Sequence, residues 1–116
     1  MTSDSFDLRT SAAGPYRLGE LGSFNVTLTT RPPWHVNQEY PTRIELVGPT
    51  EVQFPRAELG RPDAAEFTEE RARFAVPFTP AAAGSHRVEA KVSFAVCTDE
   101  SCVPADHVVS VLLPVQ

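Results

Sequence analysis

The chain has 116 residues, which is the length of one domain, and its 41% hydrophobic and 22% charged residues are ordinary for a globular protein. The formal charge is −5, Lys91 is the single lysine, and the basic residues form no cluster. This distribution excludes an electrostatic surface for DNA, RNA or an anionic membrane. No run of about 18 apolar residues occurs, so nothing in the sequence predicts a membrane span.

The first residues, 1–7, have neither the basic region nor the apolar region of a secretory signal. Two interpretations fit this segment. Either the protein is cytosolic, or a signal or anchor lies outside the given sequence. The residues themselves favour neither interpretation.

Alternation of apolar and polar residues with a period of two runs through the chain and predicts β-strands. In chain order, the predicted strands cover residues 24–29, 34–37, 43–46, 52–54, 74–78, 88–96 and 107–115. Turn signals such as Pro32-Pro33 and Gly48-Pro49 separate the strands. The pattern predicts a single immunoglobulin-like domain over residues 1–116, an all-β sandwich of about seven to eight antiparallel strands. A closed barrel is the alternative.

Three stretches carry more specific expectations. Pro77 should confine its strand to a sheet edge or end it, because proline cannot donate a ladder hydrogen bond. The last strand, 107–115, is apolar on both faces, which favours a central position in a sheet. Residues 57–73 are interpreted as a loop crossing between the sheets, with a short helix after Asp63 as the alternative.

Cys97 and Cys102 flank four polar residues between two extended segments. They are therefore expected to face each other at the neck of a hairpin, where opposite Cα atoms lie about 4.5–5.5 Å apart, within reach of a disulfide. One interpretation is a structural staple, which contributes about 2 kcal/mol for so short a loop. The other is a redox-active pair at an accessible tip.

Acidic residues surround this pair in the sequence, namely Asp99, Glu100 and Asp106, and no Lys or Arg follows Lys91. Nearby carboxylates disfavour thiolate formation, so neither cysteine should be a strongly activated nucleophile. The pattern opposes an autonomous oxidase and a Cys/His protease. It permits a passive shuttle whose partner supplies the attacking thiolate.

The chain resembles the family of amino-terminal periplasmic domains of the thiol:disulfide interchange protein DsbD. The resemblance is carried first by a strand-Cys-turn-Cys-Pro pattern, which here consists of Val92-Ser93-Phe94, Cys97, Cys102 and Pro104. Two other predicted strands also resemble the family: residues 34–37 with Tyr40-Pro41, and residues 74–78. It implies an immunoglobulin-like fold and a periplasmic or cell-envelope location. Members of the family shield the cystine with an aromatic side chain on a cap loop, and the matching region here, residues 60–70, contains Phe67.

The resemblance further implies that Cys97 and Cys102 pass reducing equivalents, so that any activity is thiol-disulfide interchange. The implied partners are proteins with reactive cysteines, namely a membrane reductant and thioredoxin-like proteins. No cofactor is expected. The alternative function, from a different class, is a non-catalytic immunoglobulin-like binding or structural module in which the same disulfide is a staple.

The histidines were weighed for other roles. A metal site drawn from Cys97, Cys102 and His107, with His86 or His35 as a further ligand, is not expected. Zinc takes four nitrogen or sulfur ligands, and only the two cysteines and His107 lie close together in the sequence. His35, beside Trp34, is interpreted as a strand residue with a solvated tip.

Overall fold

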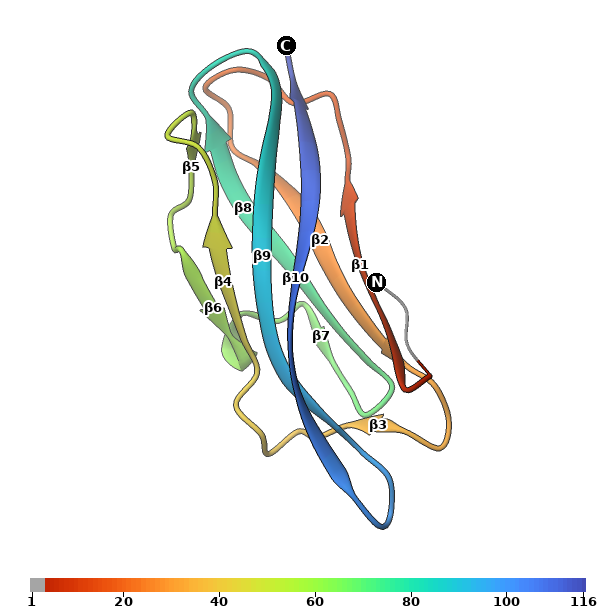
Figure 1. Cartoon of the computed structure of the whole chain (residues 1–116). Coiled ribbons are helices and arrows are strands. Elements are labelled where there is room, and N and C mark those ends of the chain that lie inside the picture. Colours follow the sequence, from red (N-terminus) through yellow and green to blue (C-terminus); the bar gives the residue numbers. More distant parts are fainter. Residues whose placement is uncertain (1–3) are drawn as a thin grey trace.

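A computed structural model describes residues 4–116 as two antiparallel sheets packed face to face (Figure 1). The start of the segment on which the signal interpretation rests, residues 1–3, lies outside the described residues. The elements are β1 (Phe6–Ala12), β2 (Gly22–Thr30), β3 (His35–Val36), β4 (Arg43–Val47), β5 (Val52–Gln53), β6 (Glu58–Gly60), the 3-10 helix η1 (Arg61–Asp63), β7 (Glu66–Phe67), β8 (Arg71–Pro80), β9 (Gly84–Cys97) and β10 (Cys102–Val115).

The strand order identifies the sandwich as immunoglobulin-like. One sheet has the order β1-β2-β8-β5, with β7 also paired to β8, and the other has the order β10-β9-β4-β6, with β3 also paired to β9. These orders are those of the ABED and GFC sheets of an immunoglobulin domain, with β6 added to the second sheet. The predicted fold class is confirmed. The structure adds three strands that the sequence did not predict, namely β1 at the start of the first sheet and the short strands β6 and β7.

The period-two pattern places one face of each long strand in the core. Phe24 and Val26 of β2 lie opposite Val76 and Phe74 of β8, and all four are buried. On the facing sheet, β9 contributes Phe94, which is also buried. Because strands of this kind bury alternate residues, the polar positions between them remain at the surface.

Strands β9 and β10 are the longest of the described strands and form one hairpin. Each strand has 14 residues, and their register runs from Gly84 opposite Val115 to Cys97 opposite Cys102. The molecule is elongated, with extents of 49 × 23 × 19 Å. The tip of the hairpin projects at one end and the C-terminus lies at the other (Figure 1).

The last strand is an edge strand, contrary to the expectation of a central position. In the sheet order β10 has β9 on one side only. Its inward residues from Val109 onward are buried, whereas Val108 and Leu112 on the outer face are 54% and 61% exposed. Strand β10 is therefore apolar on both faces because hydrophobic side chains of its outer face remain exposed at the surface. At the C-terminal end, Tyr16 forms an isolated parallel bridge to Val115 and links the two sheets.

Two further expectations need correction. Strand β8 does not end at Pro77, and it is not an edge strand over its whole length, because β2 lies on one side and β5 and β7 on the other. However, β7 pairs with residues 72–73 and β5 with residues 79–80, so the stretch around Pro77 has no strand partner on that side. The stretch 57–73 is not a plain loop, because it contains β6, η1, β7 and the start of β8.

Candidate functional site: the cystine hairpin

The turn between β9 and β10 is held by the polar residues that the sequence places there. The Thr98 N–H donates to the Ser101 carbonyl at 2.8 Å, and the Thr98 hydroxyl accepts from the N–H groups of Glu100 and Ser101 at 3.3 and 3.2 Å. A threonine hydroxyl that binds the backbone two and three residues on stabilises a tight turn. This turn brings Cys97 opposite Cys102, with their Cα atoms 4.0 Å apart, and the two sulfurs form a disulfide. The predicted pair is confirmed.

The two sulfur-bearing residues differ in exposure. Cys97 is only 4% exposed, whereas Cys102 is exposed. The reason is their place in the sheet, because Cys97 has β3 on one side and β10 on the other, while Cys102 belongs to the edge strand. After β3, the Asn37 N–H donates to the Ala95 carbonyl at 2.9 Å, and the Asn37 amide nitrogen lies 3.9 Å from the Cys102 sulfur. The disulfide is therefore accessible mainly from the Cys102 side.

His35 lies beside the cysteine pair, a placement that the sequence does not indicate. It lies opposite Cys97 in the register of β3 and β9, so His35, Cys97 and Cys102 form one row across the sheet. Register partners carry their side chains on the same face, with Cβ atoms about 4.5–5.5 Å apart. His35 also lines two hollows of about 270 and 200 Å³, which it shares with the carboxylates Glu69 and, in the second hollow, Glu39.

Fewer carboxylates lie near the cysteine pair in the structure than the sequence suggests. Asp99 and Glu100 lie in the turn and are exposed. Asp106 lies opposite Ser93, four residues along β10 from Cys102, and accepts a hydrogen bond of 2.5 Å from the Ser93 hydroxyl. Four residues of strand span about 13 Å. Asp106 is therefore not part of the acidic tip.

The fold does not bring His107 to the cysteine pair. His107 lies beside the aromatic rings of Phe6 and Phe94, with centroid distances of 5.2 and 6.1 Å. The two cysteines are bonded to each other. Among residues 4–116, no group of three or more His, Cys, Asp or Glu side chains is placed to hold a metal ion.

Phe67, the aromatic residue of the region that resembles the family's cap loop, belongs to β7 and pairs with β8 of the opposite sheet. Its ring packs against the core, with the Arg61 guanidinium 4.9 Å from the ring centroid. The residue near the exposed sulfur is instead Asn37.

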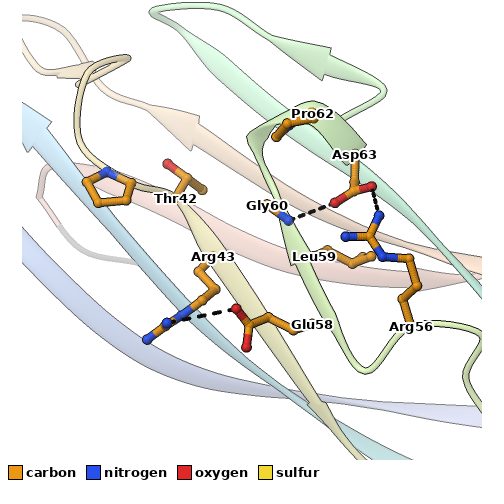
Figure 2. A pocket seen from close by; sticks show the side chains of 9 residues that line it. Thr42, Arg43, Arg56, Glu58, Leu59, Gly60, Pro62 and Asp63 are labelled. Carbon is orange, nitrogen blue, oxygen red and sulfur yellow. Dashed lines mark hydrogen bonds and ion pairs between the residues drawn. The ribbon is translucent and has the colours of Figure 1, made fainter.

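A separate hollow of about 380 Å³ lies between β4, β6 and η1 (Figure 2). Its charged residues are mutually paired: Arg56 with Asp63, and Arg43 with Glu58 at 3.9 Å. Asp63 also accepts a hydrogen bond of 2.9 Å from the Gly60 N–H. Because these charges neutralise one another, the hollow offers no free charge to a ligand, and the cystine hairpin remains the candidate site.

Comparisons with known proteins add little to this geometry. No family model matches the chain, and no curated protein matches it. Among solved structures, the chain is similar to AggA, the major subunit of the type I aggregative adherence fimbriae of Escherichia coli, with 8% identity and a TM-score of 0.48 over 99% of this chain and 98% of that one. The strand order and the Cys97–Cys102 bond by themselves define the chain as an immunoglobulin-like sandwich with a cystine at a hairpin tip. In the part of the chain that is described, no helix has the length and apolar character needed to span a bilayer.

Replacing both cysteines by alanine should lower the free energy of unfolding by only about 2 kcal/mol. The disulfide closes a loop of sequence separation 5, and, for the residues described, the main hydrophobic cluster contains neither cysteine. Urea unfolding of the wild type and the double variant, followed by circular dichroism, measures the difference. Loss of β-structure in the double variant without denaturant would contradict this expectation.

Proposed function

We propose that the domain exchanges electrons with thiol proteins through the Cys97–Cys102 disulfide, as a dithiol/disulfide shuttle. The observation that carries the proposal is the unequal exposure of the two residues at a projecting tip, with Cys97 4% exposed and Cys102 exposed. Disulfide exchange needs one sulfur that an incoming thiolate can reach and a second that leaves. Cys102, an exposed residue, meets the first requirement, and the Cys97 sulfur is the leaving group.

The position of the disulfide supports a chemical role over a stabilising one. Cys97 and Cys102 are already neighbours in the β9–β10 ladder, so the bond joins two residues that backbone pairing holds together. In antibody domains, by contrast, the conserved disulfide links the two sheets through the core. A bond at a hairpin tip constrains the unfolded chain only slightly, because the loop is short.

The chemistry of the tip favours a partner that brings its own nucleophile. Asp99 and Glu100 repel negative charge near the sulfurs, so the reduced cysteines are weak nucleophiles at neutral pH. The resemblance to the DsbD amino-terminal family supplies the partner classes: a membrane reductant on one side and thioredoxin-like proteins on the other. Thiol-disulfide exchange of this kind takes place in the periplasm or cell envelope, where disulfides persist.

The reduction potential tests this proposal against a structural disulfide. We expect a value of about −200 to −250 mV, which permits exchange with thioredoxin-like proteins. Equilibration of the domain in glutathione and dithiothreitol redox buffers, followed by alkylation and intact-mass measurement, gives the potential. A value below about −300 mV would instead favour the non-catalytic module, in which the disulfide is a staple.

A further inference from the structure

We propose that His35 donates the proton that the Cys97 sulfur takes up when the disulfide is reduced. The inference rests on the proposed exchange function and assigns a role to a residue outside the cysteine pair. Its basis is the row of His35, Cys97 and Cys102 across β3, β9 and β10. In that row the histidine lies next to the buried cysteine, and the exposed cysteine lies on the far side.

The need for a proton donor follows from the burial of Cys97. A partner thiolate attacks the Cys102 sulfur, the S–S bond breaks, and its electron pair stays on the Cys97 sulfur as a thiolate. With only 4% of Cys97 exposed, water solvates that anion poorly, and burial of an unpaired charge is costly. The carboxylates of Asp99 and Glu100 in the adjoining turn add repulsion.

An imidazolium at His35 removes this cost. It transfers its proton to the Cys97 thiolate, which becomes a thiol, and the imidazole is left neutral. The second thiolate of the partner then attacks the partner's own sulfur in the mixed disulfide and releases the Cys102 thiolate, which takes a proton from water. The partner dithiol has become a disulfide and the domain has gained two electrons. In the reverse direction, neutral His35 accepts the proton of the Cys97 thiol.

The charged groups that face His35 come from three segments. In the two hollows that His35 lines, Glu69 and Glu70 come from the segment before β8 and Glu39 from the segment after β3, while Asp99 and Glu100 lie in the turn that follows Cys97. Neither of the two hollows that His35 lines has a Lys or Arg among its described residues. No cation there repels an imidazolium, and imidazole is the side chain that changes charge near neutral pH.

The other two histidines of the chain are placed elsewhere and supply matched controls. His86 lies opposite Leu113 near the other end of the β9–β10 hairpin, and its ring nitrogen Nε2 is 2.7 Å from the Ala82 carbonyl. His107 lies opposite Val92, five rows from the cysteine pair, and its ring contacts Phe6. Only His35 is in register with Cys97.

The test is the pH dependence of disulfide reduction by dithiothreitol, with each second-order rate constant divided by the thiolate fraction of the reductant. For the wild type this corrected constant should fall about tenfold between pH 5.5 and pH 8, as the donor loses its proton. For His35→Gln it should be about tenfold lower than the wild type at pH 5.5 and flat across the range. His86→Gln should follow the wild type. His35→Asn, with thermal unfolding of each variant, separates loss of the donor from loss of the fold.

Three outcomes decide the matter. A folded His35→Gln variant that keeps the wild-type slope, or whose rate is lower by the same factor at every pH, overturns the role of His35 and leaves the exchange function standing. A wild-type disulfide that dithiothreitol does not reduce at any pH overturns the exchange function, and the role of His35 with it. A slope lost in both His35 variants and kept in His86→Gln establishes the donor.

Discussion

The thiol left at Cys102 in a Cys97→Ala variant should react with a disulfide probe at least about tenfold faster than the thiol left at Cys97 in a Cys102→Ala variant. In thiol-disulfide exchange the attacking sulfur, the attacked sulfur and the leaving sulfur lie in one line, so the reacting thiol must be accessible. Cys102 lies on the edge strand and is exposed, whereas Cys97 is 4% exposed between β3 and β10. Rates with excess Ellman's reagent at pH 8 measure the difference.

The same two variants in denaturant provide the control, because an unfolded chain exposes both thiols. There the two rates should agree to within about twofold, so that any remaining difference in the folded proteins is due to burial. A parallel experiment first converts the single thiol of a thioredoxin-like protein that lacks its resolving cysteine to the mixed disulfide with thionitrobenzoate. The Cys102 thiol of Cys97→Ala should displace thionitrobenzoate and trap that protein as a mixed disulfide, whereas Cys102→Ala should not. Equal rates in the folded variants would mean that the hairpin tip opens readily and that exposure does not select the attacked sulfur.

The sequence predicts most strands of this domain, although not β1, β6 and β7, because alternation records which face of a strand is buried. Phe24, Val26, Phe74 and Val76 show this pattern and all are core residues. The cysteine pair is equally predictable, because Cys97 and Cys102 are separated by a turn inside one hairpin. Such local pairing needs no knowledge of the rest of the fold.

The sequence does not reveal which strands lie side by side in a sheet. Strand β3 has two residues, follows Pro32-Pro33 and pairs with a strand about 60 positions later, so nothing in its pattern places His35 beside Cys97. Alternation also does not distinguish an apolar side chain covered by protein from one left in water. For that reason Leu112 suggested a central strand, although it is exposed on the edge strand β10.

Phe78→Ala should cost about 3–5 kcal/mol in the free energy of unfolding, which is more than the loss of the disulfide. Phe78 is 0% exposed. Its ring meets Tyr16 edge-to-face with centroids 4.7 Å apart and lies 6.0 Å from the ring of Phe24. Truncation removes these contacts and leaves a cavity that the surrounding sheet residues cannot fill by moving, since β8 is held by β2 along its length. Urea unfolding measures the cost.

Leu112→Ala is the matched control for this substitution, because it also removes a large apolar side chain from a strand. Leu112 is 61% exposed on the outer face of β10, so its loss should change the free energy of unfolding by less than about 0.5 kcal/mol.

Phe78 pairs with Gly22, where the chain enters β2, whereas the cystine lies at the tip of the β9–β10 hairpin. The reduction rate of a folded Phe78→Ala protein should therefore stay within about twofold of the wild type. A loss of stability similar to that of Leu112→Ala would mean that the Tyr16 and Phe24 rings close the cavity. A much faster reduction would mean that the hairpin tip depends on the packing around Phe78, and that the stability of the core and the reactivity of the disulfide are coupled.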